Sequence, residues 1–272
     1  MAETPEQLRR KLENLASLLD DSDDAIAGKA IASLLEYEDD LGDLPSRLQE
    51  DPDPLVRKRA HQLQAAMHFR YHRRMFHRLL QEDEPDFRTG MALLHLLWFD
   101  KDNQVDVYGA IDEFIAEIRR REFSTLGEIG FYLRKLGFHA VPETPSRPES
   151  FCAGMVLEDC CGADSLLAGM VAAFIDLPGL SVVRCNGKFG LYCGASEVLY
   201  ALDGWRLSPA PAQEQMEFWD SRMILRFCGS MLFSAAVYSD SFRYILTIAQ
   251  ALSGDRGDGI MKELPYPYGS SR

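Results

Sequence analysis

Residues 181–193 have the sequence SVVRCNGKFGLYC, and this stretch decides the fold class. It contains two short runs of β-branched, aromatic and aliphatic residues, 181–185 and 189–193, separated by a segment that includes Asn186 and Gly187. A third such run, 198–202, follows after Gly194. Short apolar runs separated by Gly, Asn or Asp are typical of successive antiparallel strands. The sequence therefore predicts a small antiparallel meander.

The chain on both sides of this meander has helical patterns. Leu8, Leu12 and Leu15 recur at helical spacing after the sequence Thr4-Pro5-Glu6-Gln7, which predicts a capping box. Three prolines within 142–148 predict a loop. The further helices are predicted over 54–82, 91–99, 105–121, 126–136, 151–157, 165–176, 216–233 and 241–252. We therefore expect an α+β fold that is predominantly α.

A weak repeat lies within the first 60 residues. Residues 18–26, LLDDSDDAI, resemble residues 48–56, LQEDPDPLV. Each copy ends one helix, forms an Asp-containing turn and begins the next helix. An offset of about 30 residues is in the range of helical-hairpin repeats, and the second copy resembles HEAT-type repeats.

Composition and charge restrict the partners and the compartment. A net charge of −13 argues against nucleic acid or an anionic membrane as the main partner. No basic segment followed by an apolar run begins the chain, and no apolar run reaches the length of a membrane span, so we expect a cytoplasmic protein. The cysteines match no zinc pattern and are expected to be reduced thiols, with no cofactor. They are Cys152, Cys160, Cys161, Cys185, Cys193 and Cys228.

The segment PESF at 148–151, with VLEDCCG at 156–162, resembles the bacterial SirB-type transglutaminase-like family. Glu158 and Gly162 fit the family pattern, Asn186-Gly187-Lys188-Phe189 stands at its P-x-H-F position, and Ala201-Leu202-Asp203 at its I-D position. The resemblance implies a HEAT-like helical domain over 1–140, a degenerate transglutaminase-like (papain-like) module over 141–211 and a TPR-like helical pair over 212–255. Residues 256–272 are expected to form a flexible tail.

The candidate site departs from what transglutaminase chemistry requires. That chemistry uses a thiolate at a helix N-terminus, a histidine base and an acid that orients the histidine. Asp203 matches the acid. Ser165 stands at the position of the nucleophile and Lys188 at that of the histidine, and a lysine near its ordinary pKa is protonated at neutral pH. The sequence therefore predicts no Cys–His pair at these positions.

Two catalytic alternatives remain open. Cys160 or Cys161, just before the helix that carries Ser165, could be a shifted nucleophile, and we take Cys161 as the candidate for a cysteine-dependent hydrolase or acyltransferase. Ser165, Lys188 and Asp203 could also form a serine–lysine site, although an ion pair between Lys188 and Asp203 is the simpler expectation.

The predicted helix over 54–82 is unusually basic. Arg70, His72, Arg73 and Arg74 could form a docking face for an acidic partner, whereas the alternative is a solvated face that balances the acidic helices around it. His68 and His72 lie one turn apart without a carboxylate or cysteine on the same face, so no metal site is expected.

The sequence favours a non-catalytic interaction or scaffold protein with a protein or peptide partner. Concave helical repeats ordinarily bind other proteins. The hydrolase that uses Cys161 is the alternative, and contact of nucleic acid with the basic helix is a weaker third hypothesis.

Overall fold

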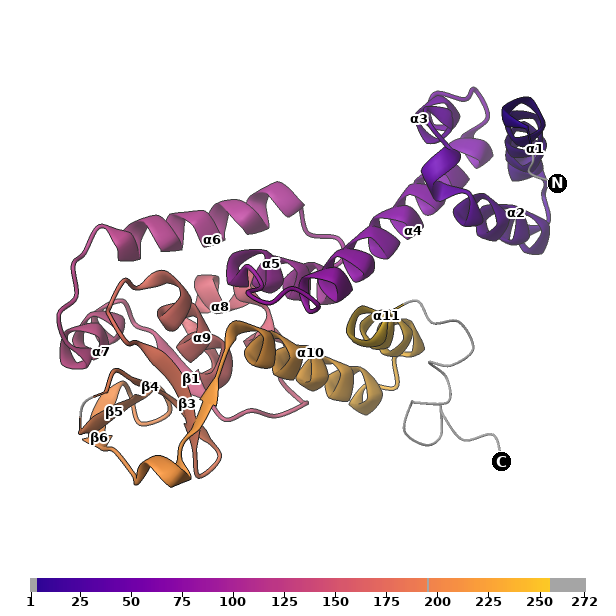
Figure 1. The fold of residues 1–272 in the computed structure, drawn as a ribbon. Helices are drawn as coiled ribbons and strands as arrows, with labels where there is room; N and C mark the ends of the chain where they lie inside the picture. Colours follow the sequence, from indigo (N-terminus) through magenta and orange to yellow (C-terminus); the bar gives the residue numbers. More distant parts are fainter. Residues whose placement is uncertain (1–3, 195, 255–272) are drawn as a thin grey trace, which may run out of the picture. The chain divides into compact units, whose positions relative to one another are not determined.

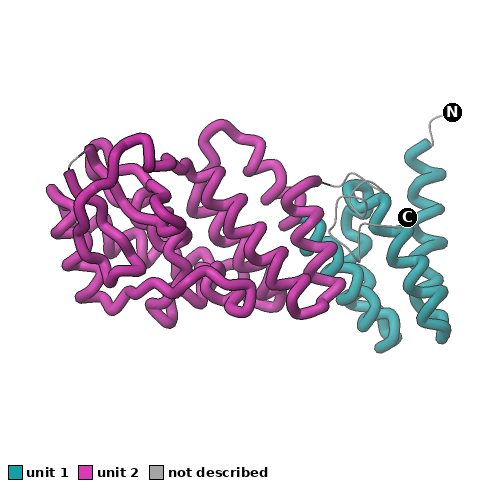
Figure 2. Tube along the Cα trace, turned by 90° about the horizontal axis from the view of Figure 1, so that it is seen from below, with its two compact units in different colours: residues 1–71 teal, residues 72–272 magenta. Residues whose placement is uncertain are grey.

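The computed structural model describes residues 4–194 and 196–254, which form two compact units, residues 1–71 and 72–272 (Figures 1 and 2). The first unit is helical, and the boundary between the units falls within the long helix α4. The elements up to this point are α1 (Pro5–Ser17), η1 (Leu18–Asp20), α2 (Asp24–Glu36), η2 (Glu38–Asp40), α3 (Leu44–Gln49) and α4 (Pro54–Leu79).

The two copies of the repeat form the same turn. Asp21 accepts a hydrogen bond from the backbone N–H of Asp23 at 2.8 Å, and Asp51 accepts one from Asp53 at 2.9 Å. Asp23 and Asp53 then cap α2 and α4 by accepting from the N–H two residues further on. Because each turn satisfies its own backbone donors, the repeat is a local property of the sequence.

Arg59, on α4, joins the two copies. Its guanidinium is 2% exposed and donates to the carbonyl oxygens of Leu19 and Asp21 and to the carboxylate of Asp24. A buried guanidinium is tolerated only where its donors are satisfied. The rest of this core is apolar and includes Leu19, Leu34, Val56, Ala60 and Leu63.

The second unit contains both the remaining helices and the sheets. The helices are α5 (Phe87–Trp98), α6 (Gln104–Arg119), α7 (Leu126–Lys135), η3 (Pro148–Phe151), α8 (Ala153–Asp159), α9 (Asp164–Phe174), η4 (Gln213–Gln215), α10 (Ser221–Tyr238) and α11 (Phe242–Ser253). None of the helices within residues 4–194 and 196–254 is long and apolar enough to cross a membrane.

A five-stranded antiparallel sheet confirms the expected meander. Its order is β6-β5-β4-β3-β7, and Asn186 and Gly187 join β3 to β4 with φ angles of 50° and 79°, as a two-residue hairpin with a type I′ turn requires. The strands are β3 (Ser181–Cys185), β4 (Lys188–Tyr192), β5 (Glu197–Tyr200), β6 (Arg206–Pro209) and β7 (Glu217–Trp219).

Two further short strands, absent from the sequence expectations, form a parallel pair. They are β1 (His139–Val141) and β2 (Cys161–Ala163), and His139 is the register partner of Cys161. Gly162 allows the close approach of α8 here, because a Cβ at this position would lie 2.7 Å from Val156. β2 leads directly into α9, so this pair fixes where α9 begins.

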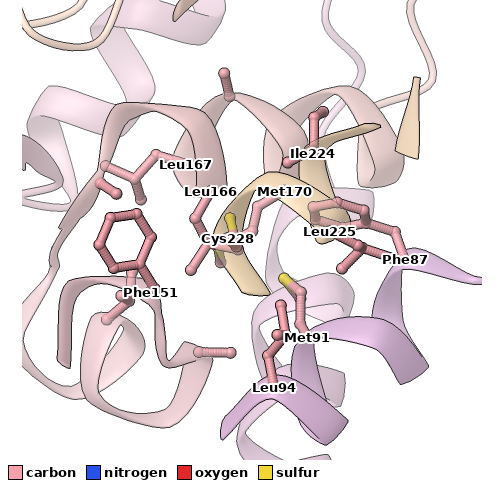
Figure 3. Close-up of a cluster of buried hydrophobic side chains, with 14 of the residues drawn as sticks. Phe87, Met91, Leu94, Phe151, Leu166, Leu167, Met170, Ile224, Leu225 and Cys228 are labelled. Carbon is pink, nitrogen blue, oxygen red and sulfur yellow. The ribbon is translucent and has the colours of Figure 1, made fainter. Parts of the chain in front are cut away.

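The core of the second unit is built around α9. Figure 3 shows Leu166 and Met170 of α9 in one cluster with Phe87 and Met91 of α5 and Leu225 of α10. One continuous core therefore includes helices on both sides of residue 140, so α5, α6 and α7 pack with the sheet module rather than forming a domain with the first repeats. The tail expected over 256–272 lies outside the described residues.

Two tryptophans attach the helices to the sheet. The indole N–H of Trp205 donates to the carbonyl oxygen of Phe138 at 2.9 Å. Trp219 on β7 makes an edge contact with Phe227 on α10, at 5.4 Å between ring centroids. The last two helices, α10 and α11, pack against each other as the expected helical pair.

Candidate functional site

Ser165 lies in the first turn of α9 and is completely buried. Its hydroxyl oxygen is 3.9 Å from the sulfur of Cys228, and its backbone N–H donates to the carboxylate of Glu143 at 3.3 Å. In the part of the chain that the structure describes, no hydrogen bond joins Ser165 to Lys188 or to Asp203. Ser165 therefore lies beside the carboxyl group of Glu143 and the thiol of Cys228 rather than beside Lys188.

Lys188 and Asp203 form the ion pair that the sequence suggested. The lysine nitrogen is 2.8 Å from a carboxylate oxygen of Asp203, and the two side chains are 46% and 38% exposed. Because the lysine nitrogen is paired with Asp203 at the surface, it is not placed to take a proton from the buried hydroxyl of Ser165. The next residue, Phe189, instead turns its backbone N–H towards α9 and donates to Asp164 at 2.8 Å.

Two carboxyl groups meet at the start of α9, and the sequence patterns did not indicate this pair. Burial, together with the negative charge of Asp164, raises the pKa of Glu143 to about 7. Burial also raises the pKa of Asp164, which is 1% exposed and has one oxygen without a hydrogen-bond partner among the described residues. Two carboxyl groups close together disfavour each other's charged form, so the proximity of Asp164 adds to the effect of burial on the pKa of Glu143.

None of the cysteines whose pKa is displaced is activated. Burial raises the pKa of Cys152, of Cys161 and of Cys228, which is the opposite of what a nucleophilic thiol requires. The described cysteines form no disulfide with one another. Cys161 is half-buried and therefore more accessible than the other two.

The position of His139 favours chemistry at Cys161. The two residues are register partners on β1 and β2, so their backbones lie side by side. Nδ1 of His139 donates to the carbonyl oxygen of Gly137 at 3.2 Å, which leaves Nε2 as the basic nitrogen. No hydrogen bond between His139 and Cys161 is present among the described side chains. No sequence pattern indicates that His139 and Cys161 are neighbours, because 22 positions separate them.

A second histidine, His95 on α5, is structural. Its Nδ1 accepts the backbone N–H of Gly154 at 3.2 Å, so Nε2 carries the proton and donates to Asp102 at 2.8 Å. Burial lowers the pKa of His95, although Asp102 opposes this effect. With both nitrogens occupied, the ring has no lone pair left to act as a base.

Arg70 and Arg73, two of the basic residues of α4, each form a hydrogen bond inside their own unit. Arg70 donates to the carbonyl oxygen of Leu35 at 2.7 Å, and Arg73 donates to the side chain of Gln250. His72 is 2% exposed, and Arg74 is half-buried. His72 is therefore unavailable to a partner, and the expected docking face is not an open stripe of positive charge. Within the described ranges, no group of three or more His, Cys, Asp or Glu side chains could hold a metal ion.

Comparison of the chain with protein-family models, with curated proteins and with solved structures finds no significant match. The residues of this chain are therefore the basis of the function proposed below.

Proposed function

We propose that this chain is a non-catalytic interaction or scaffold protein, built on a degenerate transglutaminase-like module without a Cys–His pair. The proposal rests on the burial and contacts of Ser165, Lys188 and Asp203. Ser165 is buried against Cys228, and Lys188 is held by Asp203 at the surface. Nucleophilic catalysis needs a nucleophile within hydrogen-bond reach of its base, and no hydrogen bond joins Ser165 to Lys188 among the described residues.

Two features support the transglutaminase-like assignment of the module. The N-terminus of α9 is tied to β4 by the hydrogen bond from Phe189 to Asp164, which is the relation between nucleophile helix and histidine strand that the resemblance implies. The sheet next to α9 is antiparallel, and Gly162 stands two residues before the start of the helix. A reused fold accounts for both features.

The proposed partner is a protein or peptide in the cytoplasm. The charge of −13 disfavours nucleic acid and anionic lipid as main partners. The repeats of the first unit, with their HEAT-like turns, and the TPR-like pair α10–α11 are the kinds of helical surface that bind protein segments.

A cysteine-dependent hydrolase or acyltransferase is the second candidate, and the register of His139 with Cys161 is the observation that favours it. Against it stands the raised pKa of Cys161, because a catalytic thiol needs a lowered one. The two proposals differ in the reactivity of a single residue.

Labelling of the full-length protein separates them. We expect a limiting dose of iodoacetamide-alkyne to label the half-buried Cys160, Cys161 and Cys193 slowly and at similar rates, and a fluorophosphonate probe to leave Ser165 unlabelled. Labelling of the urea-denatured protein gives the maximum extent of cysteine labelling for comparison. Rapid labelling of Cys161 alone, slowed in His139→Gln, would overturn the non-catalytic proposal.

A further inference from the structure

A groove of about 720 Å³ runs along α6 in the second unit, and Ser165, Lys188, Asp203 and Cys161 are not among its lining residues. One wall is α6, and the other is formed by α8 and by the residues that follow α7. Its lining includes a continuous set of apolar side chains: Val107, Ala110, Phe114, Phe138, Met155 and Leu157. Phe114 and Phe138 contact each other across the two walls, with ring centroids 5.4 Å apart.

The rim of the groove is acidic. Five carboxylates line it, whereas Lys101 is the only lysine or arginine among the lining residues, all of which are described. Asp102 is held by His95, and Glu117 accepts from Tyr132 and Arg120. The other three carboxylates have no side-chain partner in the described part of the chain. They are Asp106, Glu113 and Glu158.

The spacing along α6 sets the size of the ligand. Asp106, Ala110, Glu113 and Glu117 recur at three- and four-residue intervals and therefore lie on one face of the helix. The lining extends from Asn103 to Glu117, which corresponds to about 21 Å at 1.5 Å per residue. That length accommodates about four turns of a helix or about six residues of an extended chain.

We propose that this groove binds a basic amphipathic peptide segment of a partner protein, with apolar side chains on its floor and Lys or Arg side chains against its rim. The inference rests on the proposed interaction function and names the class of partner. Unpaired carboxylates around an apolar floor repel anionic ligands and attract cations. A purely polar cation would leave the floor without a contact, so the ligand needs an apolar face as well.

The test uses the full-length protein and a fluorescein-labelled 14-residue peptide that places Leu on one face of a helix and Lys on the other. Fluorescence anisotropy gives its affinity for three variants. In the groove variant, Asp106, Glu113 and Glu158 are each replaced by Lys. In the matched control, Glu122, Glu197 and Glu214, which are exposed and line no part of the groove, are replaced by Lys. The third variant is Ala110→Trp, which fills the floor and leaves every carboxylate in place.

We expect the groove variant and Ala110→Trp each to weaken binding at least tenfold, and the control reversal to weaken it less than threefold. Circular dichroism confirms that each variant is folded. Peptide binding should also protect Cys160, which lines the groove, from alkylation, and leave Cys193 unprotected. A peptide with Ser in place of Leu should bind at least tenfold more weakly.

The groove proposal would be overturned if the two charge-reversal variants lost equal amounts of peptide affinity, or if Ala110→Trp bound the peptide as well as the wild type. Either result would show that the peptide is attracted to the acidic protein as a whole. Absence of peptide binding would overturn the groove proposal too. Neither result affects the proposed non-catalytic function, which fails only if a hyper-reactive residue is found by the labelling experiment.

Discussion

Replacing Glu143 by glutamine should flatten the pH dependence of stability of the second unit. The wild-type carboxyl has a pKa of about 7 in the folded protein against an ordinary value of 4.5. The folded state therefore holds this proton more strongly than the unfolded state does. The resulting stability is fully present below about pH 4.5, declines as the pH rises and is lost above about pH 7.

The magnitude follows from the two pKa values. A difference between 4.5 and about 7 corresponds to about 3 kcal/mol of unfolding free energy, at about 1.4 kcal/mol per pH unit. Because Glu143 is only partly buried, solvent screening reduces the expected contribution to about 2 kcal/mol. Glutamine has the shape of the protonated acid, can accept from the N–H of Ser165 and can donate to the unpartnered oxygen of Asp164.

Urea unfolding between pH 5 and pH 8 measures the effect. Trp98, Trp205 and Trp219 all belong to the second unit, so their fluorescence reports on it without a signal from the first. We expect Glu143→Gln to be more stable than the wild type by about 2 kcal/mol at pH 8 and by less than about 1 kcal/mol at pH 5.

The control is Glu122→Gln, an exposed glutamate whose replacement changes the net charge equally. Its stability should follow the wild type at every pH. If the difference between Glu143→Gln and the wild type were the same at pH 5 and pH 8, the raised pKa of Glu143 would be refuted.

Three further predictions concern contacts that hold the fold. Arg59→Ala should destabilise the first unit by about 3 kcal/mol, because its removal leaves the carbonyl oxygens of Leu19 and Asp21 without their donor. Faster hydrogen exchange over residues 4–71 would show this, with Arg59→Lys restoring only part of the protection. Trp205→Phe should lower stability by about 2 kcal/mol, since the carbonyl oxygen of Phe138 loses its donor; an unchanged thermal midpoint would contradict this role. Lys188→Ala should cost less than about 1 kcal/mol, because its ion pair with Asp203 is exposed, and a larger loss would mean that the pair has a structural role.

The repeats and the meander could be predicted because their signals are local. The Asp-containing turns cap α2 and α4 with donors two residues away, and Asn186-Gly187 adopts the positive φ angles that its hairpin needs. The predicted strand 181–185 coincides with β3. By contrast, β1, β2 and β7 have three residues each, and runs so short have no recognisable period.

The positions of the long helices could be predicted from their apolar spacing, but the side of each helix that is buried could not. Tyr71 follows Val56, Leu63 and Met67 at helical spacing along α4, yet its side chain is 49% exposed. Tyr71 belongs to neither core, because α4 contributes Val56 and Leu63 to the core of the first unit and Phe76 to that of the second. The start of α10 was likewise expected at residue 216, whereas the helix begins at Ser221 after β7.

The sequence by itself determined that this is a predominantly helical α+β chain and that its helices begin at particular caps. These properties depend on neighbouring residues and on residue identity. Only the tertiary structure decided that Ser165 is buried, that Glu143 meets Asp164, that His139 lies beside Cys161 and that α6 and α8 enclose an acidic groove. Each of these pairs residues that are far apart in the chain, and their proximity follows from packing that no local pattern encodes.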